Sequence, residues 1–284
     1  MGEPDRKTAT AIVVGYNHAH CLGRCFDSLM GQQELERLEV LYIDNASADS
    51  SASMSSWHPE IRVIRNQRNV GFARAVNQGL ALAHGDYVAL VNPDTAIGPL
   101  AISRLIDRLR RQPEIGLAAP LLLNEDQSLQ RSLTHYPTLR GQLLRLLGRP
   151  PDGSTGWLVG AMLVAETALL RRLGGLDEGY FVYGEDMDLS HRVQRAGRTV
   201  HVERDLPITH TGNPRWSADR HVRVYGAYLR FLGRHHPLQR GVVGLPISAL
   251  WVARGLLGGA GPRQVVGGLR RIWSRRPDPP PGAP

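Results

Sequence analysis

Two adjacent carboxylates, Glu185 and Asp186, stand at the expected start of a helix within the stretch Tyr183-Gly184-Glu185-Asp186-Met187-Asp188-Leu189. A carboxylate in this place can act as a general base that removes a proton from an acceptor hydroxyl. Consecutive helical residues point about 100° apart, so the two acids cannot both reach one proton and we expect divided roles. Acids also stabilise the positive end of a helix, which explains part of the pattern without catalysis.

Another acid, Asp94, ends the stretch Asn92-Pro93-Asp94, directly after an apolar segment. An acid at the tip of a buried strand can hold Mg²⁺ or Mn²⁺, which prefer oxygen ligands and keep positions open for phosphate oxygens. The same three residue types form simple turns, and the spacing alone favours a turn. His210, beside a glycine, is a histidine that could complete a metal shell, although a lone histidine is more often structural.

The stretch Asp44-Asn45-Ala46-Ser47-Ala48-Asp49 has the polar groups that a nucleoside needs. Its first carboxylate and the following amide can accept a hydrogen bond from the N–H of a pyrimidine ring. Ser47 or Asp49 can instead cap the next helix, and the cap is the simpler interpretation of this stretch alone.

A glycine also stands at an expected helix start, in the stretch Asn69-Val70-Gly71-Phe72 that continues to Asn77 and Gly79. Gly71 would let the backbone approach a ligand closely, and a helix start attracts negative charge. Asn69 can equally be an N-cap.

Alternating strands and helices are expected to position these residues. The pattern predicts an α/β fold with a mostly parallel sheet and helices on both faces, in which ligands gather beyond the carboxyl ends of the strands. Tyr16-Asn17, Asp44-Asn45 and Asn92-Pro93-Asp94 stand at three such ends. The segment 121–154 is irregular and rich in arginine, and suggests a loop over the site. We expect strands at 9–14, 40–43, 61–64, 87–91, 157–164 and 199–202, and helices at 19–30, 71–83, 99–111, 166–173, 185–195 and 218–234.

The composition narrows the class of protein. The 284 residues allow one large domain with an appendage, and the net charge of +8 comes almost wholly from arginine. Such a surface suits phosphate or anionic lipid, although GC-rich codons explain the arginine equally well. The arginines are spread along the chain and aromatic residues make up only 6%, which disfavours a nucleic-acid-binding protein. No G-x-G-x-x-G follows the first strand, which disfavours a dinucleotide oxidoreductase. Cys21 and Cys25 share a helix face, so no disulfide follows.

The two ends of the chain differ from its middle. Residues 1–10 are polar and charged, which is not typical of a signal peptide, and we expect a cytoplasmic location. The apolar stretch 241–260 is interrupted by Pro246, Arg254 and glycines, so we expect it to pack or to lie at an interface. The basic segment 245–273 could rest on an anionic membrane surface, peripherally on the inner face of the cell membrane, or pack on the rest of the protein. The Pro-rich residues 275–284 are expected to be disordered.

Taken together, the motifs resemble those of the family 2 glycosyltransferases with the GT-A fold, and most closely the bacterial rhamnosyltransferase-type members. The resemblance covers about residues 8–235, so a GT-A domain would occupy 1–235 and a basic helical extension 236–274. Its motifs are Ile12-Val13-Val14-Gly15-Tyr16-Asn17, Asp44 to Asp49, Asn69-Val70-Gly71-Phe72 with Asn77 and Gly79, Asn92-Pro93-Asp94, and Gly184 to Leu189.

The resemblance implies a role for each group of residues. Asp186 resembles the catalytic base, with Glu185 as a second candidate or an acceptor binder. Asp94 would bind the divalent cation (Mg²⁺ or Mn²⁺) that bridges the donor diphosphate, and His210 resembles the family's late metal-binding histidine. The donor-binding residues would be Tyr16, Asn17, Asp44, Asn45, Asn69, Gly71, Phe72, Asn77 and Asn92. Trp157, Gly160 and Ala161 would lie near the acceptor.

An inverting transferase follows from the resemblance. It would move a sugar from a nucleoside-diphosphate sugar to a hydroxyl of a glycan or a lipid-linked acceptor, as in cell-envelope polysaccharide synthesis. A dTDP-rhamnose donor, a UDP-hexose and a galactofuranose donor all fit. Asn92 stands where the family's DxD motif begins with aspartate, so we expect it to be a weaker or water-mediated ligand.

Overall fold

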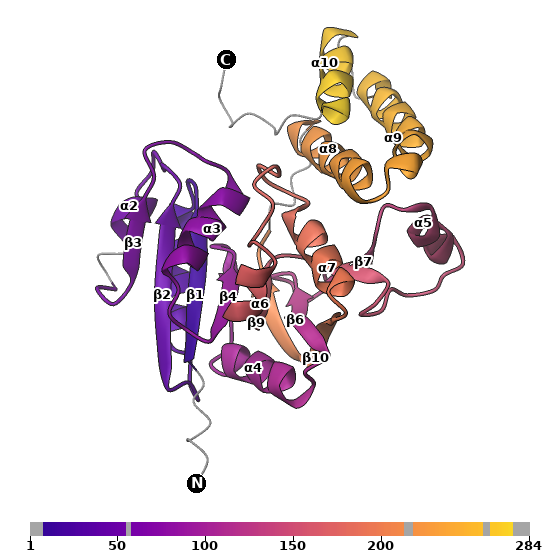
Figure 1. Cartoon of the computed structure of the whole chain (residues 1–284). Coiled ribbons are helices and arrows are strands. Elements are labelled where there is room, and N and C mark those ends of the chain that lie inside the picture. Colours follow the sequence, from indigo (N-terminus) through magenta and orange to yellow (C-terminus); the bar gives the residue numbers. More distant parts are fainter. Residues whose placement is uncertain (1–7, 55–57, 213–217, 258–261, 275–284) are drawn as a thin grey trace.

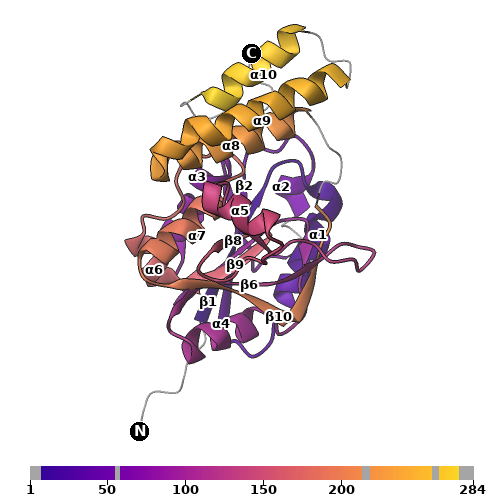
Figure 2. The same ribbon diagram turned by 90° about the vertical axis from the view of Figure 1, so that its right-hand side faces the viewer.

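The structure of the chain is a computed structural model that describes residues 8–54, 58–212, 218–257 and 262–274 (Figure 1). The Pro-rich segment 275–284, for which disorder was expected, lies outside these residues. A large sheet with helices on both faces carries a separate group of helices at one end (Figures 1 and 2).

The central sheet has eight strands and is mostly parallel, as the sequence pattern predicts. Its order is β3-β2-β1-β4-β9-β6-β10-β5, with β9 and β5 running against their neighbours. Parallel pairing places Gly15 opposite Asp44, so the carboxyl ends of neighbouring strands meet at one edge. The strands are β1 (Thr8–Gly15), β2 (Arg37–Asp44), β3 (Arg62–Arg65), β4 (Tyr87–Val91), β5 (Thr95–Ala96), β6 (Ile115–Leu123), β9 (Met162–Glu166) and β10 (Thr199–His210).

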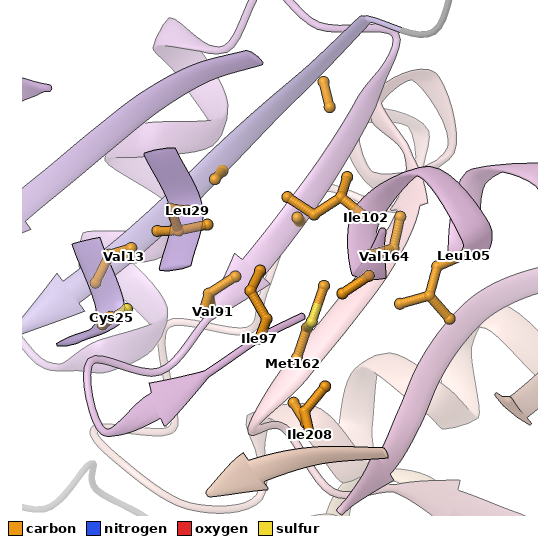
Figure 3. Close-up of a cluster of buried hydrophobic side chains, with 14 of the residues drawn as sticks. Val13, Cys25, Leu29, Val91, Ile97, Ile102, Leu105, Met162, Val164 and Ile208 are labelled. Atoms are coloured by element: carbon orange, nitrogen blue, oxygen red, sulfur yellow. The ribbon is translucent and has the colours of Figure 1, made fainter. Parts of the chain in front are cut away.

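Helices cover both faces because strand residues alternate between them. Ala11 and Val13 of β1 pack in one cluster against α1 (Ala19–Met30) and α4 (Ala101–Arg111), and Figure 3 shows Val13 in that cluster near Leu29 and Cys25. Their neighbours Ile12 and Val14 belong to a second cluster on the opposite face. The helices of that face are α3 (Phe72–Leu82), α6 (Thr167–Arg172) and α7 (Glu185–Arg195), and the short α2 is Ser51–Met54.

Two sequence expectations for the middle of the chain are wrong, and a third strand is longer than expected. The segment 121–154, expected to be irregular, contains the end of β6, the strand β7 (Leu133–His135) and the helix α5 (Leu139–Leu146). The strand expected at 157–164 is two strands, because β8 (Gly156–Leu158) pairs with β7 in a second sheet while β9 joins the main one. The strand expected at 199–202 continues as β10 to His210, through an irregularity in its pairing with β6.

The carboxyl-terminal part of the chain is a group of three helices. It consists of α8 (Ala218–His235), α9 (Pro237–Leu257) and α10 (Pro262–Trp273), which lie together in both views (Figures 1 and 2). Leu229 of α8, Trp251 of α9 and Ile272 of α10 share one apolar cluster with Met187 of α7. The boundary expected at residue 235 therefore falls inside one packed group.

Some apolar residues of 245–273 are used in this packing, whereas Leu245, Leu250 and Val266 are exposed. Trp251 Nε1 donates to the Val265 carbonyl at 3.0 Å, and Ile272 is fully buried. The segment thus packs on the rest of the protein, and its contact with a membrane surface stays a prediction. Among the described residues, no helix is long and apolar enough to cross a membrane.

Candidate active site

One cavity lies at the edge of the sheet where the strands carry their polar ends. Its volume is about 510 Å³, and it is bounded by the ends of β1, β4 and β10, the start of α7 and one side of α8. Of the residues expected at the site, the cavity is lined by Phe72, Asn92, Asp94, Trp157, Gly160, Ala161, Glu185, Asp186 and His210. The fold thus brings the expected acids and the expected metal ligands together.

The carboxylate of Asp186 is held in place by backbone N–H groups. Its Oδ2 accepts from Gly160 N at 2.9 Å, and its Oδ1 accepts from Met187 N at 2.8 Å. A Cβ at residue 160 would lie 3.1 Å from the Asp186 Cβ, so a glycine permits this close approach. Tyr183 and Gly184 just before α7 have positive φ angles of 71° and 91°, and this turn places both acids at the cavity wall.

Both acids hold their protons more tightly than free carboxyl groups do. Burial raises the pKa of Asp186 to about 6, and the N–H groups of Met187 and Gly160 limit the rise. Burial and the neighbouring Asp186 raise the pKa of Glu185 to about 8. Its Oε2 is buried and has no hydrogen-bond partner within the described part of the chain. The N–H groups of Gly160 and Met187 favour the ionised form of Asp186, whereas Glu185 Oε2 has no such donor, so Glu185 is the acid of the pair that holds its proton more tightly and Asp186 the one that can accept a proton.

This arrangement predicts how activity depends on pH. Below about pH 6 Asp186 is protonated and cannot act as a base, so kcat/KM should fall about tenfold for each unit of pH below that value. It should level off above it. The measurement is the release of nucleoside diphosphate, with saturating Mn²⁺, over about two pH units on either side of the pKa of Asp186. A profile that stays flat down to pH 5 would exclude Asp186 as the base.

Asp94 and His210 form the second polar pair of the cavity. His210 ends β10 and pairs with Thr95 of β5, which places its Nε2 3.4 Å from Asp94 Oδ1. Burial alone would raise the pKa of Asp94, but the hydrogen bond and charge of His210, with the charge of His18, hold it below the ordinary value. An ionised carboxylate beside an imidazole nitrogen suits a divalent cation, since two ligands about 2.1 Å from one octahedral ion lie about 3 Å apart.

The described residues contain no group of three or more His, Cys, Asp or Glu side chains that could hold a metal. Asp94 and His210 could therefore supply only part of a coordination shell, and phosphate oxygens of a nucleotide could supply the rest. That division is normal for Mg²⁺, which binds through one or two carboxylates together with substrate phosphates. The residues present fit a cation that arrives with a diphosphate.

Gln130 orients His210, although no pattern in the amino-acid sequence marks it as a site residue. Its Nε2 donates to the His210 carbonyl and to Asn124 Oδ1, each at 2.6 Å. Its Oε1 must then face His210 Nδ1, at 2.9 Å, and accept its proton. With Nδ1–H held by Gln130, it is Nε2 that faces Asp94, and a cation binding there would take the place of the Nε2 proton and use the nitrogen lone pair.

Replacing Gln130 with Met should therefore weaken cation binding. Loss of a residue that orients a metal-binding histidine typically costs ten- to a hundredfold in affinity, and we expect about that loss for Mn²⁺ measured by calorimetry with a nucleoside diphosphate present. Gln142→Met, at an exposed position on α5, is the matched control and should bind as the wild type does. Equal affinities in the two variants would remove Gln130 from this role.

The residues expected to hold the nucleoside form a network beside the cavity. Asn45 Nδ2 donates to Asn69 Oδ1 at 2.8 Å, and Asn45 Oδ1 accepts from Val70 N at 3.0 Å. Asn69 Oδ1 also accepts from Gly71 N, so Asn69 shapes the loop and is not the N-cap of α3, which is Gly71. Gly71 has φ 89°, and its Cβ would lie 2.9 Å from the Phe181 carbonyl. These amides set the course of the backbone at the edge of the cavity.

Other expected donor residues have different surroundings. Asp44 is buried and its Oδ1 accepts from Ser47 N at 3.3 Å. Asn17 is exposed, and its Oδ1 accepts from Ala48 N at 2.8 Å, while Tyr16 beside it is half-buried. Neither Asp44, Asn17 nor Tyr16 lines the cavity. Asp49 bonds Ser51 N and Ala19 N, which supports the cap interpretation for this acid.

Asn77 requires a correction. Its Oδ1 accepts from Leu176 N at 2.8 Å and its Nδ2 donates to the Leu176 carbonyl at 2.9 Å. Both ends of the amide are thus used to hold the loop that precedes α7. Asn77 positions this loop and does not face the cavity.

Several cavity residues were absent from the expected site residues, among them His18, Tyr183 and Tyr228. His18 follows the polar end of β1 directly, so its place after Tyr16-Asn17 was an available signal. Tyr183 stands beside the acids in a positive-φ conformation that the sequence does not reveal. Tyr228 comes from α8, more than 40 residues after the acids in the chain, and only the packing of α8 brings it there.

Comparison with known proteins gives the family. The model of "Glycosyl transferase family 2" matches residues 10–163, more than half of the chain. An N-acetylglucosaminyl-diphospho-decaprenol L-rhamnosyltransferase of Mycobacterium tuberculosis is 30% identical over 216 residues, which cover 66% of this chain and 70% of that protein. The pre-mycofactocin glycosyltransferase of the same organism is 26% identical over 82% of this chain, and the match spans 49% of its length.

Solved structures show the same fold. A mannosyltransferase from Pyrobaculum calidifontis, in complex with GDP-Man and Mn²⁺, superposes with a TM-score of 0.62 at 19% identity over 94% of this chain and 88% of that one. TarS of S. aureus in complex with UDP-GlcNAc gives a TM-score of 0.62 at 15% identity over 95% and 82%. Since the family model covers most of the sheet and these neighbours share its architecture, the chain belongs to glycosyl transferase family 2, has the GT-A fold and is similar to the rhamnosyltransferases of that family.

Proposed function

We propose that this glycosyltransferase is metal-dependent and inverting, and that it transfers rhamnose from dTDP-rhamnose to a hydroxyl of a lipid-diphosphate-linked glycan in cell-envelope polysaccharide synthesis. The observation that carries this proposal is the shared cavity. Asp94 with His210 lines one part of it, and Asp186 with Glu185 lines another. A cation site and a base in one cavity are what a direct displacement at a sugar phosphate requires.

Each residue has a defined part in the reaction. Asp186, ionised and held by Gly160 and Met187, removes the proton of the acceptor hydroxyl. The acceptor oxygen forms its bond to the anomeric carbon as the bond from that carbon to the diphosphate oxygen breaks. One displacement from the opposite side inverts the anomeric configuration. A cation held by Asp94 and His210 would stabilise the negative charge on the departing nucleoside diphosphate.

Glu185 has a different part because it stays protonated near neutral pH. Its buried carboxyl group can donate a hydrogen bond to a sugar oxygen in the cavity, where its Oε2 has no protein partner within the described ranges. This assigns Asp186 to proton transfer and Glu185 to holding the acceptor, as the different directions of consecutive helical side chains require.

The relatives support the choice of substrates. The M. tuberculosis relative is named for an N-acetylglucosaminyl-diphospho-decaprenol acceptor and for rhamnose, and two structural neighbours were solved with GDP-Man or UDP-GlcNAc. A basic chain of net charge +8 also suits an acceptor that carries a diphosphate.

A panel of donors tests the proposal. The purified chain would be given dTDP-rhamnose, UDP-glucose, UDP-N-acetylglucosamine, UDP-galactofuranose and GDP-mannose, each with Mn²⁺ and an N-acetylglucosaminyl-diphospho-polyprenol. We expect nucleoside diphosphate release to be fastest with dTDP-rhamnose, and NMR of the product should show an inverted anomeric centre. Turnover of a UDP-sugar alone would assign the chain to the hexosyl or galactofuranosyl transferases of this fold, and retention of configuration would contradict the mechanism.

A further inference from the structure

Exposed apolar side chains gather on two helices of this structure. Eleven large apolar side chains are exposed within the described ranges. Seven of them come from α5, from the residue that caps its carboxyl-terminal end, and from the first half of α9. We call this surface the leucine face. Its members are Leu139, Leu143, Leu146, Leu147, Leu238, Val242 and Leu245.

The spacing of these residues is that of a buried helix side. On α5 they stand at positions i, i+4, i+7 and i+8, and on α9 at i, i+4 and i+7. A helix of a globular protein turns such a stripe toward its core. Here the stripes face outward, since Leu146 is 84% exposed and Leu238 is 94% exposed. Solvent-facing stripes on two neighbouring helices indicate a partner that is itself apolar.

The two stripes meet at their amino-terminal ends. Leu139 N donates to Gln239 Oε1 at 2.9 Å, which joins the first turn of α5 to the first turn of α9. Figures 1 and 2 both show α5 just beside the three-helix group, on the same side of the molecule. The two stripes therefore lie on neighbouring helices and not on distant parts of the molecule.

The charge around the leucine face is of one sign. Residues 137–150 contain Arg140, Arg145 and Arg149 and no acid, and all three arginines are exposed. The helix α9, Pro237–Leu257, also contains no Asp or Glu. Leucine beside arginine, without acids, is the composition of protein segments that lie in the headgroup region of an anionic membrane.

The leucine face adjoins the acceptor side of the cavity. Trp157 of β8 lines the cavity, pairs with Thr134 of β7, and donates from Nε1 to the His135 carbonyl at 3.1 Å. The helix α5 begins four residues after His135. Burial raises the pKa of Tyr228 in the cavity, and the positive charge of Arg145 on α5 opposes that rise, so this arginine lies within electrostatic reach of Tyr228.

We propose that the leucine face inserts into the anionic leaflet that carries the acceptor, so that the acceptor enters the cavity past α5 with its diphosphate near Arg145. The acceptor part of this inference rests on the proposed function, whereas membrane binding by the leucine face does not. The arginines contact lipid phosphates while the leucines enter the apolar layer. The basic helix α10 is not the contact, because all of its large apolar residues except Val266 pack in the cluster with α8 and α9.

Vesicle sedimentation tests the surface directly. The full chain should sediment with vesicles of equal parts phosphatidylcholine and phosphatidylglycerol, and much less with phosphatidylcholine alone. The affinity of the double variant Leu143→Glu/Leu146→Glu for the anionic vesicles should be lower by at least about tenfold, because two apolar side chains are replaced by negative charges. Both positions are solvent-exposed, so the variant should keep the wild-type Tm.

The matched control is Met30→Glu/Val266→Glu, which changes the net charge equally at exposed positions away from the leucine face, one of them on α10. It should bind vesicles as the wild type does. Wild-type sedimentation by the leucine variant, or loss of binding by the control, would overturn the proposal. So would a wild type that dimerises without lipid and becomes monomeric in the leucine variant, because the face would then bind a second copy.

Activity assays separate this inference from the proposed function. With a short-chain, water-soluble acceptor, the leucine variant should turn over as the wild type does, and with acceptor embedded in vesicles it should be at least about tenfold slower. Absence of turnover by the wild type with either acceptor would contradict the proposed function and leave vesicle binding as the test of the surface. Equal losses with both acceptors would contradict the membrane role.

Discussion

Asp186→Asn should abolish sugar transfer while the donor still binds. The amide keeps the shape of the side chain but cannot accept a proton, and a positioned general base contributes about 10² to 10⁴ in rate. We expect kcat to fall by that amount with the affinity for nucleoside diphosphate and Mn²⁺ unchanged. The fold should change little in stability. The amide leaves one of the N–H groups of Gly160 and Met187 without an acceptor, but the variant also removes a buried charge, and the two effects oppose each other.

A matched control, Asp188, lies two residues further along α7 and points to a different side of the helix. Asp188 is fully buried, and its carboxylate accepts from Arg192 Nε at 2.6 Å and pairs with His235 Nε2 at 2.7 Å. Burial alone would raise the pKa of Asp188, but His235 and Arg192 outweigh it and lower that pKa. Asp188→Asn should therefore lower Tm by weakening a buried ion pair, and spare most of kcat below the melting temperature.

These two variants separate chemistry from folding. Single-turnover transfer and thermal unfolding would be measured on both. An Asp186→Asn enzyme with wild-type turnover would remove this carboxylate from the mechanism, and Glu185→Gln would then be the variant to measure. A large loss of Tm in Asp186→Asn would show that the side chain supports the fold and that the activity loss is indirect.

Asp94→Ala should remove the benefit that Mn²⁺ gives to donor binding. A residue that only orients a metal ligand is worth ten- to a hundredfold in affinity, so loss of the ligand itself should cost about a hundredfold or more. Calorimetry of nucleotide-sugar binding with Mn²⁺ and then with EDTA gives the metal-dependent part. In the variant the two values should converge, because His210 alone cannot hold the cation beside the diphosphate.

The control for charge is Asp27→Ala on α1. Its side chain is 73% exposed and contacts His58, far from the cavity lining, and its loss changes the net charge by the same amount. Donor affinity with Mn²⁺ should match the wild type. If Asp94→Ala binds the donor with unaltered affinity in the presence of Mn²⁺, the cation is held elsewhere.

Much of the fold could be predicted because its signals are local. The helices expected at 19–30 and 185–195 begin and end where α1 and α7 do, since helical periodicity and terminal residues act within a few turns. The strand at 87–91 has its expected bounds for the same reason. The failures lie where pairing is non-local: one apolar run at 157–164 was divided between two sheets, which no window of sequence specifies.

The same contrast between local signals and long-range contacts applies to the residues of the candidate site. Acids that end strands or begin helices, such as Asp94 and Asp186, are visible in the chain because their residue types and neighbours already suggest chemistry. Gln130 is not, because its importance comes from two hydrogen bonds across 80 residues to His210. Asn77 was expected to bind the donor, but its side-chain amide makes hydrogen bonds with the backbone of Leu176, 99 residues away.

The sequence by itself determined the family, the alternation of strands and helices and the acids that can do chemistry, since these depend on residue types and short-range spacing. Only the tertiary structure decided which strand ends share a cavity, which amides hold loops, and which apolar stripes remain uncovered. Leu143 and Val243 have equally apolar side chains on helices, yet one is exposed and the other buried. That difference arises from which elements pack against each helix, and long-range packing is not encoded in any single segment of the chain.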